Sequence, residues 1–377
     1  MPTNIELKAH CSSLAAAHAV CTSLGGSLIR SQLQTDTYFA VPQGRLKLRQ
    51  HGSSAYLIYY NRADQPSERE ASFDLFPIGG DSARLADLFS SLFGARTTVV
   101  KNRDTYEWEG CLINLDSVRG IGEFLEIEVP VEKVQSQERA FQLAARLKRE
   151  FGITPADVVP WSYADIAIMY AAALRHQARI SQLESPGQVF IIDGPSASGK
   201  TTLVHSLSRR SELGLHLVPR YSTRPRRDNA ATESEYIFVS PEEFRALASG
   251  GGFIEYRDFQ FGMSYGLPWL ETIEAMARKE NVIGIANWGN IRHIKAVCPA
   301  AITILVDAPL DTLRRRLMDR GFNSPEQIQE RLDNAAVARF YKPYYDHVIQ
   351  NDDGMLDATE SEMSRIIASY LPRSHSA

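Results

Sequence analysis

The chain has little cysteine, no long apolar run and no strong excess of charge of either sign. Its four cysteines stand at positions 11, 21, 111 and 298, and none has a CxxC or Cys/His ligand spacing. Reduced thiols in a cytoplasmic protein are therefore expected. No uninterrupted apolar run reaches the roughly 18 residues of a membrane-spanning helix, and the N-terminus lacks the apolar region of a signal peptide. A net charge of −4 predicts no binding to nucleic acid or to a membrane surface.

The composition is otherwise that of a globular protein, with 44% hydrophobic and 23% charged residues. A chain of 377 residues exceeds the size at which one hydrophobic core usually stops growing, so two domains are expected. The polar segment QLESPG at 182–187 contains Pro186 and Gly187, as is typical of a domain boundary. We predict a first domain over residues 1–178, a linker over 179–187 and a second domain over 188–377.

A phosphate-binding motif opens the second domain. Residues 189–192 form a short apolar run typical of a buried strand, and Gly194, Gly199, Lys200 and Thr201 then complete G-x-x-x-x-G-K-[ST]. A Gly/Ser-rich turn is the plainer interpretation, but the strand–loop–helix setting favours an anion site, because loop and helix-start amides together surround a phosphate. Lys200 would neutralise the β- and γ-phosphates, and the Thr201 hydroxyl would hold Mg²⁺. The predicted ATP-binding residues are Gly194, Pro195, Ser196, Ala197, Ser198, Gly199, Lys200, Thr201 and Thr202.

The sequence pattern of the first half predicts many strands. Helices are expected over about 11–24, 81–93, 136–150 and 161–181. Several strands place charges on alternate residues: Glu6 and Lys8; Arg45, Lys47 and Arg49; Lys101 and Arg103; Glu126 and Glu128. Within the last three of these sets all the charges have the same sign. One interpretation is antiparallel strands with a solvated face. The other is a closed sheet with its charged face inward. Arginines and lysines would bind a polyphosphate there, and glutamates would hold Mg²⁺ or Mn²⁺.

Several segments of this half resemble the CYTH superfamily, which includes class IV adenylate cyclases, thiamine triphosphatases and inorganic triphosphatases. They are NIELKAH at 4–10, QTDTYFAVPQGRLKLR at 34–49, LIYYNR at 57–62, GIGEFLEIEV at 120–129 and SYADI at 162–166. The resemblance implies an α+β triphosphate-tunnel domain built on a closed antiparallel barrel. It also implies metal ligation by Glu6, Glu126 and Glu128, and triphosphate contacts by Lys8, Arg45, Lys47, Arg49, Lys101 and Arg103.

The chain departs from that family in two places. The opening E-x-E-x-K is here Asn4-x-Glu6-x-Lys8, and Leu112 and Asn114 stand where relatives carry an arginine and a histidine. Losing a metal carboxylate and an arginine weakens or redirects catalysis. Cyclisation and hydrolysis of a triphosphate therefore both stay open, since they differ in whether a ribose hydroxyl or water attacks.

The second half alternates strands with helical patterns, which indicates an α/β domain with a parallel sheet. Helices are expected over 309–320, 325–339 and 358–371. Its basic residues form two clusters, Arg220 with Arg224, Arg226 and Arg227, and Arg314 with Arg315, Arg316 and Arg320. A solvated face is the ordinary interpretation of such a cluster. Beside a phosphate-binding loop, guanidiniums favour phosphoryl transfer instead, because that chemistry needs positioning and charge neutralisation.

The second half resembles guanylate kinase in the order of its segments, which are the phosphate-binding loop, STRPR, YIFVS, FIEY, SYG, LRRRLMDRG and ERLDNA. The resemblance implies that the acceptor is bound by Arg224, Arg227, Tyr236, Glu255 and Tyr265, with Glu255 reading guanine. It assigns catalytic roles to Lys200, Arg316, Arg320 and Arg331.

This half also departs from its family, since Ala230, Leu267 and Ala286 replace a glutamate, a small hydroxyl residue and an aspartate. Such losses weaken base discrimination. The RYSTRP turn at 220–225 also resembles ribose 1,5-bisphosphate phosphokinase, which acts on a sugar phosphate.

We therefore predict a bifunctional enzyme. ATP would phosphorylate an acceptor, with GMP as the first candidate and a sugar phosphate as the alternative, while the tunnel would process a triphosphate with Mg²⁺ or Mn²⁺. A scaffold that binds nucleotide or protein without catalysis is the competing class. Retention of Lys200, Thr201, Arg320 and Arg331 argues against it.

Overall fold

The computed structural model describes residues 2–62, 67–226, 235–258, 262–287, 289–319 and 324–371. The chain divides into two compact units, Met1–Ile168 and Met169–Ala377. This division falls inside the helix Tyr163–Ile180. The domain boundary predicted at the linker 179–187 therefore stays a prediction. Within the described ranges, no helix is both long and apolar enough to cross a membrane.

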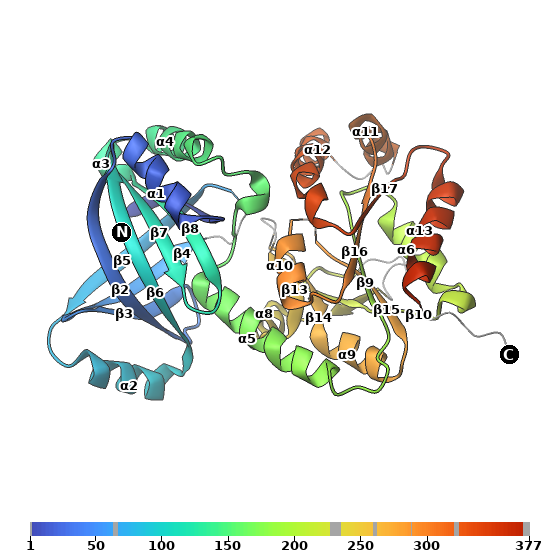
Figure 1. Cartoon of the computed structure of the whole chain (residues 1–377), viewed down its shortest axis with the longest axis horizontal. Helices are drawn as coiled ribbons and strands as arrows, with labels where there is room; N and C mark the ends of the chain where they lie inside the picture. Colours follow the sequence, from blue (N-terminus) through green and yellow to red (C-terminus); the bar gives the residue numbers. More distant parts are fainter. Residues whose placement is uncertain are drawn as a thin grey trace. The chain divides into compact units, whose positions relative to one another are not determined.

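The first unit is a closed barrel of eight antiparallel strands, as the sequence predicted (Figure 1). The order around the barrel is β1-β5-β4-β3-β2-β6-β7-β8. The strands are β1 (Thr3–His10), β2 (Ser27–Phe39), β3 (Arg45–His51), β4 (Ser54–Arg62), β5 (Arg69–Ile78), β6 (Ala95–Trp108), β7 (Cys111–Val118) and β8 (Gly122–Pro130).

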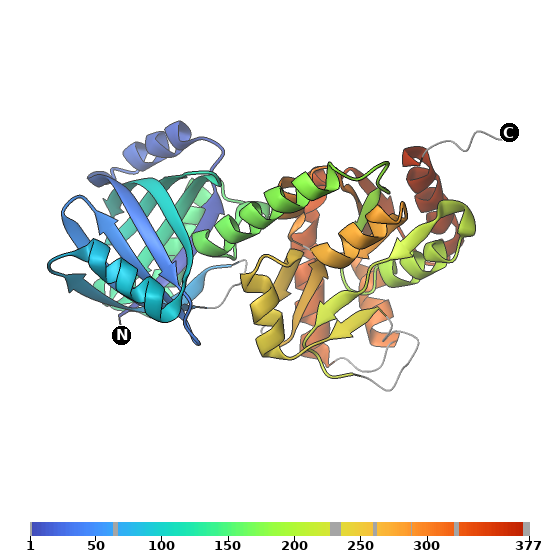
Figure 2. The same ribbon diagram turned by 90° about the horizontal axis from the view of Figure 1, so that it is seen from below.

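Helices cover the outer side of this barrel, so both faces of several strands are buried. They include α1 (Leu14–Ser23), α2 (Ser82–Phe93), α3 (Val131–Val134) and α4 (Gln137–Glu150). They are followed in the chain by η1 (Pro155–Asp157) and α5 (Tyr163–Ile180). Ile5 and Leu7 of β1 pack in one apolar cluster with Leu143 and Leu147 of α4. Figure 2 shows α2 (light blue) along the outside of the barrel, where its residues pack against Leu48 of β3. The outward face is therefore the apolar one, and the charged alternate residues point inward.

The second unit contains a parallel sheet of five strands in the order β10-β15-β9-β16-β17. These strands are β9 (Val189–Asp193), β10 (Leu215–Leu217), β15 (Asn281–Ile285), β16 (Ile302–Asp307) and β17 (His347–Gln350). Val189 and Ile191 belong to one apolar cluster, while Phe190 and Ile192 belong to another. Burial of both faces explains why this strand reads as a continuous apolar run.

Helices lie on both faces of the parallel sheet (Figure 1). One face is covered by α6 (Lys200–Ser208) and α13 (Leu356–Tyr370), and the other by α9 (Trp269–Ala277) and α10 (Ile291–Val297). The remaining helices are η2 (Ser211–Leu213), α8 (Pro241–Ser249), α11 (Leu310–Asp319), α12 (Pro325–Ala338) and η3 (Arg339–Tyr344).

A second sheet of four strands was not predicted. Its order is β12-β11-β14-β13, with β11 (Arg220–Ser222), β12 (Tyr236–Phe238), β13 (Phe253–Asp258) and β14 (Ser264–Pro268). The pair β11–β12 is parallel, whereas β11–β14 and β13–β14 are antiparallel. Tyr236, Glu255 and Tyr265, three of the residues that the sequence assigned to the acceptor, lie on this sheet.

Candidate functional sites

The barrel encloses a cavity of about 150 Å³ whose wall is mostly charged or polar. Five of the six cations assigned to the triphosphate line it, as do the three glutamates assigned to the metal. The described residues that line the cavity are Asn4, Glu6, Lys8, Tyr38, Lys47, Arg49, Ile58, Tyr60, Phe73, Leu75, Lys101, Arg103, Glu126, Glu128, Ser162 and Tyr163. Strand pairing brings the charges together, because Glu6 lies opposite Glu128 and Lys8 lies opposite Glu126 across β1 and β8.

Among the described residues, Arg45 is the predicted triphosphate-binding cation that does not line the cavity. Its Nη2 lies 3.2 Å from Oδ2 of Asp165, which also accepts a bond from the Ser162 hydroxyl at 2.6 Å. Arg96 reaches the other Asp165 oxygen at 3.4 Å. Arg45 is thus held at the start of α5.

Two buried aspartates that the sequence analysis missed hold the other cations in place. Asp36 lies directly opposite Arg49, and it accepts bonds from Arg49 Nε and Nη2 at 2.7 Å and from Lys47 Nζ at 3.0 Å. Burial alone would raise the pKa of the Asp36 carboxyl, but Arg49 and Lys47 hold that pKa well below its ordinary value. The alternation of side chains along β2 could have indicated the position of Asp36, because residues 34, 36 and 38 point to the same face of the strand.

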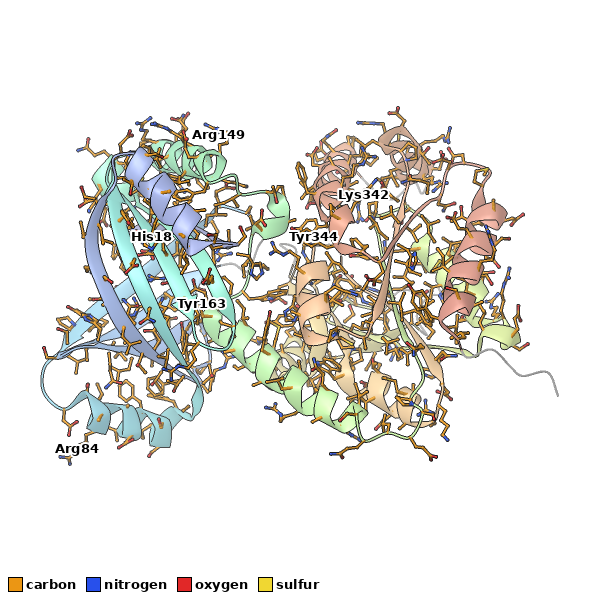
Figure 3. All side chains as sticks on the ribbon, viewed as in Figure 1. His18, Arg84, Arg149, Tyr163, Lys342 and Tyr344 are labelled. Carbon is orange, nitrogen blue, oxygen red and sulfur yellow. The ribbon has the colours of Figure 1, made fainter. Side chains whose placement is uncertain are left out.

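The same arrangement recurs on β6 and β7. Asp116 lies opposite Arg103 and accepts bonds from its Nε at 2.6 Å and its Nη2 at 2.5 Å, while Lys101 Nζ lies 3.4 Å away. The hydroxyl of Tyr163, labelled in Figure 3 at the start of α5, donates to Asp116 at 2.7 Å. The Tyr163 ring also lies 3.8 Å from Lys8 Nζ. We call each Lys-x-Arg pair with its facing aspartate a clamp.

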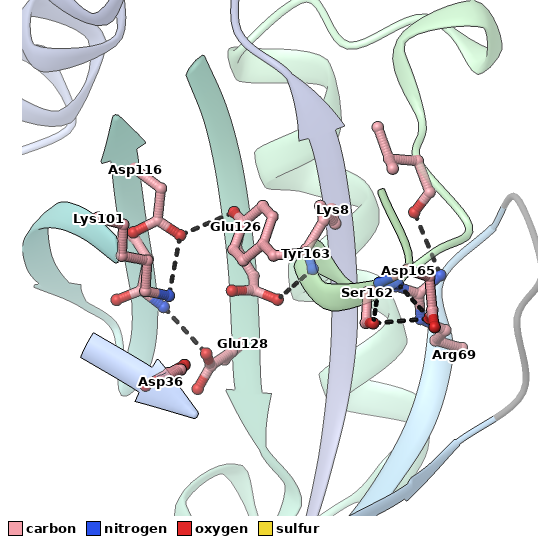
Figure 4. A network of polar contacts seen from close by, with 12 residues as sticks. Lys8, Asp36, Arg69, Lys101, Asp116, Glu126, Glu128, Ser162, Tyr163 and Asp165 are labelled. Carbon is pink, nitrogen blue, oxygen red and sulfur yellow. Dashed lines mark hydrogen bonds and ion pairs between the residues drawn. The ribbon is translucent and has the colours of Figure 1, made fainter. Parts of the chain in front are cut away.

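Arg103 is surrounded by carboxylates. Besides Asp116, its Nη2 lies 2.5 Å from Glu126 Oε2, and its Nη1 lies 3.6 Å from Glu128 Oε1. Lys8 Nζ lies 3.4 Å from the other Glu126 oxygen. Figure 4 shows Lys8, Asp116, Glu126 and Glu128 in this network. Across the described ranges, no three His, Cys, Asp or Glu side chains are gathered as a ready metal site, and the guanidinium lies between the carboxylates instead.

Burial and neighbouring charges separate the pKa values of these groups. Burial would raise the pKa of Glu126, but Lys8 and Arg103 hold it well below its usual range. Burial and the adjacent Glu126 raise the pKa of Glu128, whose Oε1 also accepts a bond from Asn114 Nδ2 at 3.0 Å. Burial and Arg103 lower the pKa of Lys101 to about 7. Carboxylate oxygens are ligands that suit Mg²⁺ or Mn²⁺, and in this structure Arg103 lies between those of Glu126 and Glu128.

The phosphate-binding loop of the second unit lies between β9 and α6. A side chain at Gly194 (φ 153°) would collide with the Val306 carbonyl oxygen, and one at Gly199 (φ 92°) would collide with the Asn351 amide. Both positions therefore require glycine. Lys200 Nζ donates to the Pro195 carbonyl at 3.1 Å, and Thr201 is the second residue of α6.

Two of the predicted catalytic arginines reach this loop from separate helices. Arg331 of α12 donates from Nη1 to the Ser196 hydroxyl at 2.9 Å, and Arg316 of α11 donates from Nη1 to the Ala197 carbonyl at 3.3 Å. Arg316 also donates to the Asn351 carbonyl at 3.0 Å. The third, Arg320, lies outside the described residues.

The structure adds two buried supports of the loop that the sequence analysis did not name. Asn351 donates from Nδ2 to the Ser198 carbonyl at 2.7 Å. Asp193 accepts a bond from the Gly194 amide at 2.6 Å and another from the Tyr345 hydroxyl. Burial raises the pKa of Asp193.

Four of the five predicted acceptor residues lie on or next to the four-stranded sheet: Arg224, Tyr236, Glu255 and Tyr265. The Arg224 guanidinium lies 4.6 Å from the Tyr236 ring, and that ring lies 6.0 Å from the Tyr265 ring. Glu255 is fully buried and bonded to Asn287 and Asn290. The fifth predicted acceptor residue, Arg227, lies outside the described residues, as does Ala230.

The loop between β9 and α6, on which two arginines converge, has the arrangement of a P-loop that surrounds nucleotide phosphates. Two family models match the chain: the CYTH domain over residues 2–163 and guanylate kinase over residues 187–370. The chain belongs to the guanylate kinase family through its second half, and its first half matches the model of the CYTH domain.

Individual relatives give the extent of the likeness. A guanylate kinase of Hahella chejuensis is 36% identical over 170 residues, which cover 44% of this chain and 80% of the relative. One from Alkalilimnicola ehrlichii is 30% identical over 189 residues, covering 50% and 91%. A solved protein from Pyrococcus horikoshii is 25% identical, with a TM-score of 0.40, covering 43% of this chain and 98% of that one.

Proposed function

We propose that the second unit transfers the γ-phosphate of ATP to a phosphorylated acceptor. The observation that carries the proposal is the convergence of Lys200, Arg316 and Arg331 on one phosphate-binding loop. Lys200 would neutralise the β- and γ-phosphates, and the two arginines would stabilise charge on the transferring group. Thr201 would hold Mg²⁺, which would screen the phosphate charges when bound. Arg320 completes the proposed set.

Two acceptors are candidates. GMP is supported by the relatives named guanylate kinase, and ribose 1,5-bisphosphate by the internal bonding of Glu255. In either case Arg224, Tyr236, Tyr265 and Arg227 would hold the acceptor phosphate. Arginine suits that role because its planar guanidinium can bind two phosphate oxygens at once.

We infer that the barrel processes a triphosphate with a divalent metal. Glu6, Glu126 and Glu128 line the same cavity as Lys8, Lys47, Arg49, Lys101 and Arg103, which supports carboxylates for Mg²⁺ or Mn²⁺ beside cations for phosphate oxygens. Arg45 would act at the start of α5. Attack by water would give a triphosphatase, and attack by a ribose hydroxyl would give a cyclase.

One experiment tests both proposals. The purified full-length chain is given ATP and Mg²⁺ with GMP, dGMP, AMP or ribose 1,5-bisphosphate, and the phosphorylated product is identified. The same chain is then given ATP, thiamine triphosphate or tripolyphosphate alone. Absence of transfer to every acceptor would favour a catalytically silent scaffold for the second unit. Absence of triphosphate turnover would leave the barrel as a binding domain.

A further inference from the structure

Glu255, the residue expected to read guanine, is bonded entirely within the protein. It lies on β13 and none of its surface is exposed. Its Oε1 accepts bonds from the Asn287 backbone amide and side-chain Nδ2, both at 3.2 Å. Its Oε2 accepts bonds from Asn287 Nδ2 at 3.0 Å and Asn290 Nδ2 at 2.7 Å. A carboxylate can read guanine only by accepting bonds from the base, and here both oxygens already have donors.

Arg220 completes this buried arrangement. Its Nη2 donates to Asn287 Oδ1 at 2.6 Å, so the Asn287 amide bonds to the guanidinium on one side and to the carboxylate on the other. The Arg220 guanidinium lies 5.2 Å from the Tyr265 ring. We call Arg220, Asn287 and Glu255 the relay. Freeing Glu255 for a ligand would break buried charge-assisted bonds, which is costly because the separated groups stay desolvated.

Two neighbouring positions are also unable to read a base. Leu267 and Ala286 are 1% and 2% exposed, and both belong to the apolar cluster that contains Ile254 and Trp269. Leu267 is the register partner of Glu255 across β13 and β14. Side chains packed in this way offer no hydrogen-bond donor or acceptor to a purine edge.

Resting on the proposed phosphotransfer, we propose that this chain selects its acceptor by the phosphorylated sugar and not by the base. Asn287 is the residue that determines this specificity, because it holds Glu255 away from the ligand. The acceptor class is therefore a sugar phosphate ester, and a nucleoside monophosphate binds through its phosphate and ribose alone.

The test compares GMP with AMP, which share phosphate and ribose and differ in the base edge. Dissociation constants are measured by calorimetry on the full-length wild type and on Glu255→Gln, Asn287→Ala and the double variant, each checked for a cooperative thermal transition. We expect wild type to bind the two nucleotides within about threefold of each other, and Glu255→Gln to leave that ratio unchanged. Asn287→Ala should raise the preference for GMP by about tenfold, the worth of one charge-assisted bond. The double variant should lose that gain.

A wild-type preference for GMP that disappears in Glu255→Gln would overturn the proposal, and this isosteric variant decides the matter even if Asn287→Ala fails to fold. Transfer assays with GMP, AMP and ribose 1,5-bisphosphate distinguish a failure of the proposed phosphotransfer from a failure of the proposed specificity. Equal binding of GMP and AMP without transfer to any acceptor would sink the phosphotransfer and leave the specificity argument standing. Phosphate transfer with a preference for GMP that depends on Glu255 would support the phosphotransfer and overturn the specificity argument.

Discussion

At the residue scale, opposite charges in the barrel neutralise one another. Arg103 contacts Asp116, Glu126 and Glu128, so the proposed metal carboxylates already have a cation between them. Under the proposed function, a divalent cation would have to displace that guanidinium before it could bind Glu126 and Glu128 together. The metal affinity would then depend on a basic residue as well as on the acidic ligands.

Replacing Arg103 should thus strengthen metal binding by the ligand-free chain. We expect Arg103→Gln to bind Mn²⁺ about tenfold more tightly than wild type, because removing a competing cation unmasks the carboxylates. Paramagnetic resonance of free Mn²⁺ measures this without phosphate present. Arg45→Gln is the matched control, since Arg45 pairs with Asp165 and should leave the affinity unchanged. Weaker Mn²⁺ binding by Arg103→Gln would contradict the expectation.

A second residue-scale prediction concerns the barrel glutamates. Glu126→Ala and Glu128→Ala should each remove metal-dependent turnover of a triphosphate, because both carboxylates line the cavity on β8. Phosphate release from tripolyphosphate with Mg²⁺ or Mn²⁺ measures it. Glu132→Ala, at the first turn of α3, serves as the control. Persistent turnover in both cavity variants would place the metal elsewhere.

At the element scale, strand pairing makes the clamps. The Lys-x-Arg pairs of β3 and β6 face aspartates on β2 and β7 through antiparallel register, with Asp36 opposite Arg49 and Asp116 opposite Arg103. A slip of one residue would turn every charge toward the apolar outer layer. The clamps therefore hold the cations in position and also disfavour other registers.

Breaking one clamp should destabilise the barrel. Asp36→Asn should lower the free energy of unfolding near pH 7 by on the order of 3 kcal/mol, because Arg49 and Lys47 would be left buried with less compensation. Urea unfolding measures the change. Asp87→Asn, the same substitution at an exposed position of α2, should have little effect.

The acid dependence of stability gives the same prediction a second readout. The folded-state pKa of Asp36 is depressed, so its stabilisation is present above the unfolded value of about 3.9 and is lost as pH falls through the folded value. Wild type should therefore lose more stability on acidification than Asp36→Asn. Parallel acid profiles for the two proteins would argue against the clamp.

At the scale of the whole molecule, the two proposed phosphate sites of one chain have unrelated architectures. One uses a barrel interior with carboxylates and cations, and the other uses a loop between strand and helix with arginines from α11 and α12. Each unit has its own apolar core, so their chemistries should be separable by mutation.

Lys200→Ala tests that separation. It should reduce phosphotransfer by at least about a hundredfold, since a phosphate-neutralising charge is lost, while any triphosphate turnover by the barrel stays at the wild-type rate. Coupled assays of ADP formation and of phosphate release measure the two activities on one preparation. Glu126→Ala should show the opposite pattern. Unaltered transfer by Lys200→Ala would refute the role assigned to the loop.

Local patterns in the sequence predicted many of the elements. The strand–loop–helix around Gly194 and Lys200, the alternating charges of β1, β3, β6 and β8, and helices such as α2 and α4 follow from spacing along a single segment. The alternation of strands and helices predicted the parallel sheet and the family resemblance implied the closed barrel, and the structure confirms both. Assignments of individual residues to ligands remain predictions.

Tertiary structure decided which side chains meet. The pairing of Asp36 with Arg49, the position of Arg103 among three carboxylates, the bonding of Arg45 to Asp165 and the relay around Glu255 all depend on pairing between segments far apart in sequence. Alternation along a strand says which face a residue occupies, but not which residue of another strand it faces. For that reason the sequence alone predicted two phosphate-binding units, while only the fold showed that Glu255 is bonded to Asn287 and Asn290 and that Arg103 lies between the proposed metal ligands.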